Sequence, residues 1–292
     1  MTTTLLPRIQ RYIQGRFKYQ SFTTGNPDRA ESGKKKSTAE MAHRVRDRFQ
    51  ASTETSPWEL LWKDGLTPWD IGRPTPLLCK ELERFSLVGS KRTLHTLVPG
   101  CGAGYDLATL AAHHGQLLDL GKIDSASVTG LDLSENALQS ARRNIAPLIS
   151  SNLSDKLCLN LICGDFFNAN TWKVVHSVES DHSKIAAVLS GSPVFDFIFD
   201  YTFFCALSPS MRNAWGRQTS LLLDPETGQL LTLIFPITPE EDAEKGPPYP
   251  VSVADYRKAL EPNNLVIRTG PYESEETIRQ RKGIEQVCWW NT

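Results

Sequence analysis

The feature that most constrains the fold is a glycine-rich turn between an apolar run and a helical pattern. The apolar run is Leu94–Val98, and the turn after it holds Pro99 and three alternate glycines, Gly100, Gly102 and Gly104. A short apolar run that ends in turn residues predicts a buried strand. Glycine permits positive φ and lets the backbone approach a bound group closely. Strand, glycine turn and helix start form the unit that brings backbone close to a nucleotide-like ligand.

The glycine spacing narrows the choice of ligand. Dinucleotide-binding turns have the pattern G-x-G-x-x-G, and phosphate-binding loops have G-x-x-x-x-G-K-[ST]. This chain has G-x-G-x-G, with neither a third glycine in the dinucleotide register nor the lysine. Its pattern is typical of methyltransferases that use S-adenosylmethionine (SAM), a cofactor without phosphate. A plain tight turn between strand and helix fits the same spacing, so the motif alone does not decide.

Apolar runs alternate with amphipathic helical patterns from Thr93 onward. The apolar runs predict strands at Leu94–Val98, Val128–Leu133, Leu159–Cys163, Phe195–Asp200, Leu230–Phe235, Leu265–Thr269 and Gln286–Trp290, and the helical patterns predict helices over 103–114, 134–146, 208–223 and 252–260. Apolar strands separated by helices indicate a parallel sheet that is covered on both faces. We therefore predict an α/β fold of the class I, Rossmann-like methyltransferase type, with a mostly parallel seven-stranded sheet.

The chain divides into an expected N-terminal extension, 1–50, and a SAM-dependent methyltransferase domain, 51–292. Residues 1–24 combine basic residues and an apolar helical face with no acidic residue before Asp28. This composition resembles a mitochondrial presequence. It fits equally well an N-terminal helix that packs on the domain or covers its site.

Four further stretches are predicted from their polarity and position. Residues 25–37 predict a polar linker and residues 38–50 a charged surface helix. Residues 115–127 and 168–193 lie between predicted sheet elements and predict surface insertions.

The overall charge and the cysteines exclude several classes of partner. The 292 residues carry a formal net charge of −1, so no strong field attracts nucleic acid or an anionic membrane. No apolar run approaches the ~18 residues of a membrane-spanning helix. None of the six cysteines forms C-x-x-C or has zinc-like spacing to a histidine, so we expect no metal and a reducing compartment. We expect a monomer acting on a small molecule in the cytoplasm, or in mitochondria if residues 1–24 direct import.

Polar residues after the second and third predicted strands are candidates for cofactor binding. In open parallel sheets, ligands bind beyond the carboxyl ends of the strands. Asp132 ends the second strand and could accept both hydroxyls of a ribose, or could instead cap the next helix. Asp165 and Phe166 follow the third strand, where a carboxylate suits the exocyclic amine of an adenine and a ring suits its face. Phe166 could also be simple core.

The end of the fourth predicted strand is the candidate reaction centre. Asp200 and Tyr201 follow a fully apolar run, and we assign both as catalytic. Tyr201 would orient the acceptor or the methyl group and contact the cofactor, and Asp200 would accept a proton or fix the tyrosine. Phe203, Phe204 and Trp215 would form an aromatic pocket that excludes water.

Three tryptophans precede the sheet. Trp58 and Trp62 are four residues apart, on one helical face, and Trp69 follows a turn. A sulfonium cation is attracted to an indole face by ~0.5–2 kcal/mol, so we expect these rings to line the cofactor pocket. The alternative is a hydrophobic plug on the sheet, and a packed lid can do both. The Pro-Pro-Tyr sequence at 247–249 follows the fifth strand rather than the fourth, so we expect it to shape the substrate pocket.

The segments that carry these candidates, taken together, resemble a known family. They are Trp-Glu-Leu-Leu-Trp-Lys-Asp-Gly-Leu-Thr-Pro-Trp-Asp-Ile-Gly-Arg-Pro-Thr-Pro-Leu (58–77), Leu-Val-Pro-Gly-Cys-Gly (97–102), Gly-Leu-Asp-Leu-Ser (130–134), Phe-Asp-Tyr-Thr-Phe-Phe-Cys-Ala (199–206), Gly-Pro-Pro-Tyr (246–249) and Arg-Lys-Gly-Ile-Glu (281–285). Their order over roughly residues 57–290 resembles the halide/thiol methyltransferases of the thiopurine methyltransferase family. The resemblance implies SAM contacts from Trp58, Trp62, Trp69, Gly100, Gly102, Asp132, Asp165, Phe166 and Tyr201.

The expected reaction is methyl transfer from SAM to a small nucleophile, a thiol or a halide. Such soft acceptors need no strong base, which fits the absence of a Ser-His-Asp or Cys-His set. The alternative is an O-methyltransferase acting on a hydroxyl of a small aromatic or pyrone-type secondary metabolite, where Asp200 would matter more for the proton. A SAM-binding module without catalysis and a nicotinamide oxidoreductase are further alternatives, disfavoured by the intact strand end and by the glycine spacing.

Overall fold

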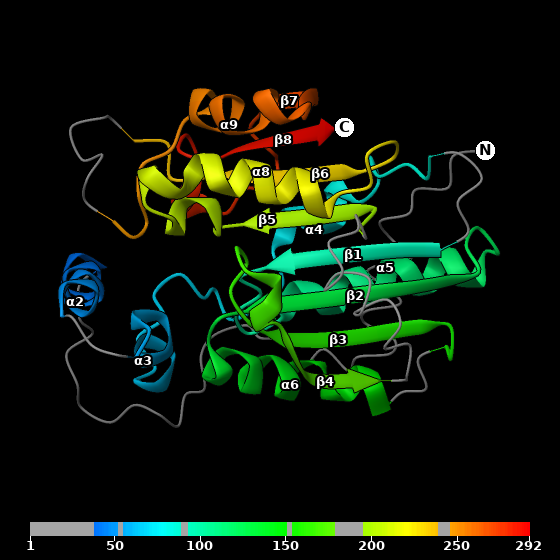
Figure 1. The fold of residues 1–292 in the computed structure, drawn as a ribbon, viewed down its shortest axis with the longest axis horizontal. Coiled ribbons are helices and arrows are strands. Elements are labelled where there is room, and N and C mark those ends of the chain that lie inside the picture. Colours follow the sequence, from blue (N-terminus) through cyan, green and yellow to red (C-terminus); the bar gives the residue numbers. More distant parts are fainter. Residues whose placement is uncertain (1–37, 52–54, 89–92, 151–153, 179–194, 239–245) are drawn as a thin grey trace.

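The computed structural model describes residues 38–51, 55–88, 93–150, 154–178, 195–238 and 246–292. Within them, eight strands form one sheet in the order β4-β3-β2-β1-β5-β6-β8-β7 (Figure 1). The strands are β1 (Thr93–Pro99), β2 (Ser125–Asp132), β3 (Leu157–Cys163), β4 (Lys173–Val178), β5 (Phe197–Tyr201), β6 (Gln229–Ile234), β7 (Val266–Tyr272) and β8 (Gln286–Asn291). The predictions for residues 1–24 and 25–37 lie outside the described residues.

The prediction of an α/β fold with a mostly parallel sheet is confirmed, but the predicted count of seven strands is wrong. β3, β2, β1, β5 and β6 run parallel, and β8 is antiparallel to β6 and β7. The eighth strand is β4, which pairs antiparallel with β3 inside the stretch 168–193 that we predicted as a surface insertion. The insertion predicted at 115–127 is also wrong, because it comprises the last turn of one helix and the start of β2.

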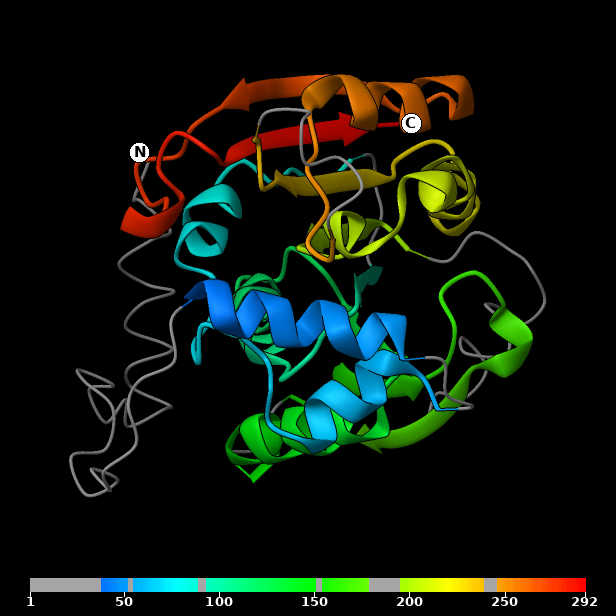
Figure 2. The same cartoon turned by 90° about the vertical axis from the view of Figure 1, so that its left-hand side faces the viewer.

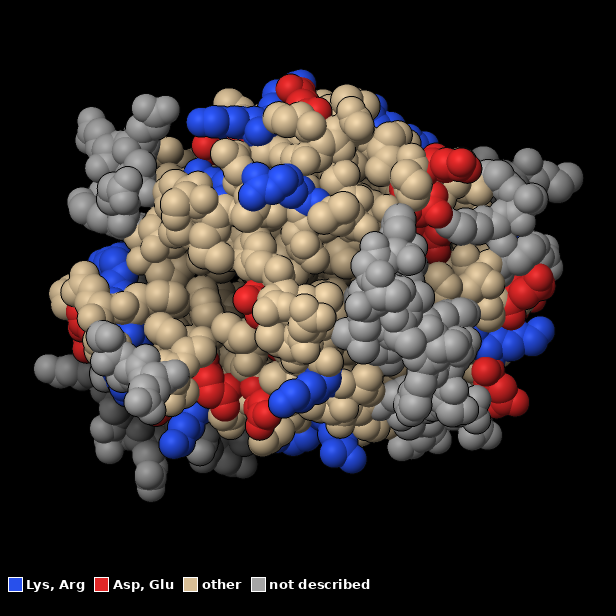
Figure 3. Space-filling view, in the orientation of Figure 1, with Lys and Arg blue, Asp and Glu red and all other residues tan. Residues whose placement is uncertain are grey.

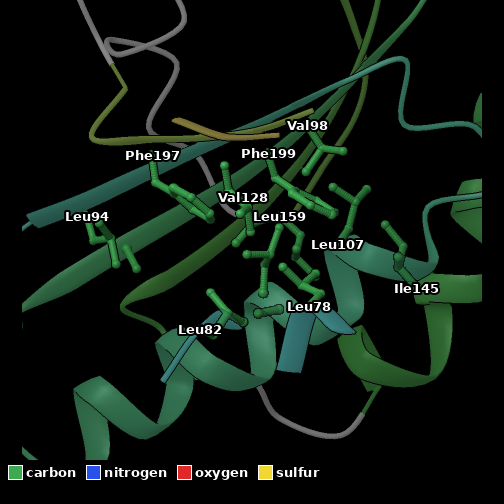
Figure 4. Close-up of a cluster of buried hydrophobic side chains, with 14 of the residues drawn as sticks. Leu78, Leu82, Leu94, Val98, Leu107, Val128, Ile145, Leu159, Phe197 and Phe199 are labelled. Carbon is green, nitrogen blue, oxygen red and sulfur yellow. The ribbon is translucent and has the colours of Figure 1, made fainter. Parts of the chain in front are cut away.

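Helices cover both faces of the sheet. They are α2 (Thr38–Gln50), α3 (Pro57–Lys63), α4 (Pro76–Glu81), α5 (Tyr105–Asp119), α6 (Glu135–Ser150), α8 (Arg212–Leu222) and α9 (Val253–Leu260). One buried cluster joins α4, α5 and α6 to β1, β2, β3 and β5, as Figure 4 shows for its central side chains. A second cluster joins α8 and α9 to the opposite face. Short 3-10 turns complete the described chain: η2 (Ala169–Thr171), η3 (Phe204–Ala206), η4 (Pro209–Met211), η6 (Glu261–Asn263) and η7 (Arg279–Arg281).

The strand order creates a crevice at the carboxyl edge of the sheet. After β1 the chain builds outward through β2 and β3, and it then returns to the other side of β1 with β5. At such a reversal the connections on the two sides diverge, which leaves room for a ligand beyond the strand ends. The arrowheads of β1 and β5 point to this edge in Figure 1.

Helices α2 and α3 lie across this edge, as Figure 2 shows face-on. They pack through a small cluster of their own in which Val45, Leu61 and Leu66 are buried. Ring contacts extend it, because the centroid of the Phe49 ring lies 4.8 Å from that of Trp58. The predicted helix over 38–50 is therefore present and contacts α3, while the boundary between residues 50 and 51 stays a prediction.

The surface in Figure 3 carries basic and acidic side chains at scattered positions. No helix among the described residues is long and apolar enough to cross a membrane. All six cysteines lie in the described part of the chain, and none forms a disulfide.

Candidate active site

The glycine loop between β1 and α5 is shaped so that side chains are excluded from it. Gly100, Gly102 and Gly104 all have positive φ, of 59°, 53° and 72°, which L side chains rarely adopt. A Cβ on Gly100 would lie 2.6 Å from the Phe203 ring, and one on Gly102 would lie 3.2 Å from the Trp62 indole. The loop is therefore bare backbone at the base of the crevice, with aromatic rings beside it.

Asp132 holds the loop in place from the end of β2. Its carboxylate accepts hydrogen bonds from the backbone N–H of Gly102 and of Ser134, each at 2.9 Å. Burial raises its pKa to about 6, so the group is ionised at neutral pH and can still accept a hydroxyl. Ser134 caps α6, accepting from the N–H of Ala137 at 3.1 Å. Asp132 is thus bonded to the glycine loop, and its contact with a ribose stays a prediction.

A contact that sequence reasoning missed links α3 to this acid. Glu59 accepts hydrogen bonds from the hydroxyl of Ser134 and from the side-chain amide of Asn136. The N–H of Asn136 adds a third bond, at 3.3 Å. Glu59 therefore joins α3, which carries Trp58 and Trp62, to the start of α6. Its partner Ser134 is two residues after Asp132. The place of Glu59 between Trp58 and Trp62 was the available signal.

The three tryptophans form one aromatic group over the glycine loop. The centroid of the Trp69 ring is 5.3 Å from that of Trp58 and 6.5 Å from that of Trp62, both edge to face. All three rings are half-buried. Trp62 is the member that lies against Gly102, so it is the indole closest to the predicted cofactor. Trp58 packs toward α2 through Phe49.

Asp165 and Phe166 lie at the end of β3, as the sequence predicts. Asp165 accepts the N–H of Phe167 at 2.9 Å and is half-buried. Phe166 is buried, and its ring centroid lies 5.1 Å from that of Phe203. Since Phe203 borders Gly100, these residues and the glycine loop belong to one neighbourhood.

The end of β5 separates the two residues assigned as catalytic. Phe199 and Tyr201 stack with centroids 6.1 Å apart, and both belong to the cluster on the α4–α6 side. Asp200 points to the other face, since successive strand residues alternate. The hypothesis that Asp200 fixes Tyr201 is therefore wrong.

Asp200 is completely buried and holds the turn after β5. One carboxylate oxygen accepts the backbone N–H groups of Phe203 and Phe204, at 3.3 and 3.2 Å. Between them, Thr202 has φ of 61°, a strained value for a β-branched residue. Burial raises the pKa of Asp200 to about 7, while these bonds and the nearby Trp215 indole lower it. Asp200 thus maintains a turn that presents Phe203 to the glycine loop.

The predicted aromatic pocket is only partly correct. Phe203 borders the loop, but Phe204 and Trp215 are fully buried in the α8–α9 cluster, with ring centroids 4.6 Å apart. Both rings are packed into this cluster and have no exposed surface with which to line an open pocket. The Pro-Pro-Tyr segment does reach this turn, where the N–H of Tyr249 donates to the carbonyl of Cys205 at 2.7 Å.

Tyr201 lies beside two buried charged groups, Arg281 and Glu285, which are the ends of the segment 281–285 quoted above without an assigned role. The guanidinium carbon of Arg281 lies 5.0 Å from the centroid of the Tyr201 ring, and 4.2 Å from that of Phe235. Arg281 is 6% exposed and pairs with the 2%-exposed Glu285 at 3.2 Å. Burial raises the pKa of the Tyr201 phenol, so it stays protonated at neutral pH, although Arg281 acts in the opposite direction.

Thr75 and Asp106 complete the surroundings of the phenol. The N–H and the hydroxyl of Thr75 donate to the two carboxylate oxygens of Asp106, at 2.7 and 2.8 Å. The Thr75 side chain also lowers the pKa of the Tyr201 phenol, against the larger rise that burial causes. Asp106 stands two residues after Gly104, a position that the glycine motif could have flagged.

The arrangement fits SAM on its own geometry. The loop leaves little room for a Cβ, and a buried, ionised carboxylate is bonded to it. An indole rather than a basic side chain covers the loop at Gly102, which suits a cationic group and not a phosphate. No group of three or more His, Cys, Asp or Glu residues in the described ranges is arranged to hold a metal ion.

Comparison with known protein sequences supports the same conclusion. Residues 53–180 and 185–288 match the family model described as Thiopurine S-methyltransferase (TPMT). The "Thiocyanate methyltransferase 1" of Brassica oleracea is 36% identical over 242 residues, which cover 82% of this chain and 86% of the relative. The "Probable thiol methyltransferase 2" of Arabidopsis thaliana is 32% identical over 260 residues, covering 89% of this chain and 95% of the relative.

Among solved structures, the CurJ carbon methyltransferase shares the fold. Its TM-score is 0.52 at 14% identity, and the match covers 86% of this chain and 65% of that chain. At this identity the likeness shows the architecture alone, a class I methyltransferase sheet with helices on both faces.

Proposed function

Because this chain belongs to the thiopurine S-methyltransferase family, we propose that it methylates a small-molecule thiol with SAM as the methyl donor. Two relatives with the family's sulfur-directed names cover more than four fifths of the chain. The observation that carries the assignment is Asp132, a buried carboxylate bonded to the glycine loop. When bound, SAM would supply an activated methyl group, which an acceptor sulfur takes up while the donor leaves as a neutral thioether.

Most of the predicted site residues would contact the cofactor. Asp132 would accept the ribose hydroxyls, and the backbone at Gly100 and Gly102 would lie along the cofactor. The indole of Trp62 would cover the sulfonium group, with Trp58 and Trp69 holding that ring in place. Asp165 and Phe166 would contact the adenine.

Tyr201 would contact both the cofactor and the acceptor. Its ring contacts the Phe199 ring and the Arg281 guanidinium, and these contacts restrict how the ring can move. A fixed polar group at the reaction centre aligns the acceptor, and alignment alone can supply several kcal/mol. Asp200 acts differently from the sequence prediction, by holding the turn that carries Phe203.

The test is turnover of the purified chain with SAM and a panel of acceptors: mercaptoethanol, thiocyanate, iodide, and a phenolic or pyrone hydroxyl. We expect an S-methyl product, identified by mass. An O-methyl product alone would instead support the alternative function. SAM affinity, measured by calorimetry, should be lost in Asp132→Ala and kept in the matched control Asp155→Ala, an exposed acid in the turn before β3.

Three expectations about the protein's context remain to be measured. A monomer should sediment at the mass of one chain, and nucleic acid should show no affinity. Localisation of the full chain fused to a fluorescent protein would separate the cytoplasm from mitochondria, and deleting residues 1–24 would show whether they direct import.

A further inference from the structure

Arg281 is a buried cation at the carboxyl edge of the sheet. It is the last residue of η7, shortly before β8. Because β8 is antiparallel to β6, its first residue Gln286 lies opposite Ile234, at the carboxyl end of β6. The guanidinium carbon lies 5.0 Å from the centroid of the Tyr201 ring and 4.2 Å from that of Phe235. Arg281 is therefore placed beyond the ends of β5 and β6, where open parallel sheets bind their ligands.

Most of the hydrogen-bonding capacity of this guanidinium is unused. An arginine side chain carries five N–H donors in a planar fork. Among the described residues, the guanidinium of Arg281 has one hydrogen-bond partner, the carboxylate of Glu285, which Nη1 contacts at 3.2 Å. The faces of the Tyr201 and Phe235 rings attract its charge but accept no conventional hydrogen bond. Since Arg281 is only 6% exposed, water reaches little of the fork, and a ligand could supply the missing acceptors.

Stability alone gives no reason for this arrangement. Two charges removed from water lose hydration that their mutual attraction only partly offsets, so a buried ion pair is weak evidence of stabilisation. Another buried arginine, Arg212, donates to the Pro250 carbonyl through Nη2 and contacts Asp255 through Nη1. Arg212 thereby joins separate segments, whereas Arg281 bonds only to a residue four positions further along the chain.

The charge of Arg281 also acts on the place where the acceptor is proposed to lie. Burial raises the pKa of the Tyr201 phenol, and among the charged groups Arg281 has the largest effect and lowers it. Asp106 and Glu285 act against Arg281 with smaller effects. The guanidinium therefore favours negative charge beside the Tyr201 hydroxyl, which is the group proposed to contact the acceptor.

We propose that Arg281 binds the negative charge of the methyl acceptor, so that the crevice takes its acceptor as a small sulfur anion, either a thiolate or thiocyanate. This inference rests on the proposed function and names the charge state of its substrate. The anion would lie beside Tyr201, between the guanidinium and the methyl group to be transferred. Arg281 would thus touch the substrate itself and determine which acceptors the site prefers.

The reaction removes the charge that Arg281 holds. The acceptor sulfur uses its electron pair to form a bond to the methyl carbon, as the bond from that carbon to the sulfonium sulfur breaks and leaves its pair on that sulfur. Both sulfur products are neutral. Because the negative charge already decreases on the way to the transition state, the guanidinium stabilises the bound anion more than the transition state. Arg281 should therefore contribute to KM rather than to kcat.

The first test measures thiocyanate binding without reaction, by calorimetry on the full chain loaded with S-adenosylhomocysteine, the demethylated cofactor. Arg281→Gln removes the charge and keeps a polar side chain, and the Kd of thiocyanate should rise about 30-fold. Arg281→Lys keeps the charge and loses the fork, so its Kd should stay within about 5-fold of the wild type. The matched control is Arg212→Gln, because Arg212 is also buried, lies 5.2 Å from the Phe204 ring centroid and pairs with an acid. Its Kd should change less than about 2-fold.

Glu285→Gln separates anion binding from a purely structural role of the ion pair. The amide oxygen can still accept from Arg281, but the negative charge that competes with the anion is gone. Thiocyanate affinity should therefore rise about 3-fold. If the pair only held the fold together, the same variant would bind thiocyanate equally well or more weakly. Together with Arg281→Lys, this variant decides the question even if Arg281→Gln does not fold.

With SAM present, Arg281→Gln should separate KM from kcat. The KM for thiocyanate should rise about 30-fold, while kcat stays within about 3-fold of the wild type and the KM for SAM is unchanged. A residue that merely held the Tyr201 ring in place would instead lower kcat, and the charge of Arg281→Lys would not restore the KM for thiocyanate.

The outcomes distinguish the anion site from the function on which it rests. Unchanged thiocyanate affinity in Arg281→Gln, or weakened affinity in Glu285→Gln, would overturn the anion site while thiol methylation stands. A wild type that binds thiocyanate through Arg281 but methylates neither thiocyanate nor mercaptoethanol would overturn the proposed function, and Arg281 would remain an anion site without a role in methyl transfer.

Discussion

Asp200 and Tyr201 are consecutive residues at the end of β5, but their side chains lie on opposite faces of the sheet. Tyr201 faces the α4–α6 side, where Thr75 and Asp106 act on the pKa of its phenol. Asp200 faces the α8–α9 side and is completely buried beside Trp215 and Tyr256. An acid at the carboxyl end of a strand is therefore not a site residue by its position alone. The face to which it points decides whether it meets the crevice or the core.

The two sides differ in how their polar groups are used. On the α8–α9 side, Arg212 bonds to the carbonyl of Pro250 at 2.7 Å and pairs with Asp255 at 3.3 Å. Those contacts join segments to one another. On the α4–α6 side, Asp132 and Tyr201 keep acceptor capacity toward the crevice. The comparison predicts that substitutions on the first side change stability, whereas those on the second change ligand binding.

The largest effect is expected for Asp200→Ala. The substitution leaves the buried N–H groups of Phe203 and Phe204 without an acceptor next to the strained Thr202. The free energy of unfolding, measured by urea denaturation, should fall by ~2–3 kcal/mol.

Asp200→Asn is the control, because its amide oxygen can still accept both bonds. It should keep most of the stability and, at saturating substrate, most of the turnover. Full stability combined with lost turnover in Asp200→Asn would contradict the comparison and restore Asp200 as a proton acceptor.

Two tryptophans test the comparison next. Trp62→Ala should weaken SAM binding about tenfold, through the loss of an indole beside the glycine loop. Its stability should change little, since the ring is half-buried. Trp215→Phe should show the reverse, with ~1–2 kcal/mol of lost stability and unchanged SAM affinity by calorimetry. Equal SAM affinity in both variants would place the indole of Trp62 outside the cofactor site.

The acids Asp132 and Asp200 both have raised pKa values, of about 6 and about 7, and pH separates them. An ionised Asp132 accepts the ribose hydroxyls, and its protonation removes that acceptor. SAM affinity should therefore fall as the pH drops below 6, by about tenfold at one pH unit below the pKa.

Variants assign the effect to one acid. The pH dependence should disappear in Asp132→Asn, and it should persist in Asp200→Asn because Asp200 titrates on the closed face. If the pH dependence of SAM affinity persists in Asp132→Asn, the group that titrates is not Asp132 but another one, such as Asp106 or a group of the cofactor.

Much of this arrangement could be predicted from the sequence, because it depends on chain order. The glycine loop after β1 and Asp132 after β2 must meet, since neighbouring parallel strands end at one edge. The period of two in β5 already places Phe199 and Tyr201 together and Asp200 apart. This period of two outweighs the adjacency of the acid and the tyrosine in the chain.

Other features depend on packing and leave no local signal. The contact of Thr75 with Asp106 joins residues 31 positions apart, and that of Glu59 with Ser134 joins residues 75 apart. Only the docking of α4 and α3 brings these pairs together. The strand β4 was missed for a different reason. As an edge strand it leaves Val174 38% exposed and Val175 44% exposed, so its apolar pattern is weak.

The smallest effects come from the two contacts that join segments on each side, Glu59 and Arg212. Glu59→Gln keeps the shape but weakens three bonds to the start of α6, which position Ser134 beside Asp132. SAM affinity should fall about threefold, because a neutral acceptor replaces a charged one at a partly exposed contact. Arg212→Lys retains the charge but loses the geometry toward Pro250, so stability should fall by ~1 kcal/mol with SAM affinity unchanged. If Glu59→Gln instead lowered stability and left SAM affinity unchanged, the contact of α3 with α6 would serve packing only. The α4–α6 side would then not differ from the α8–α9 side in this respect.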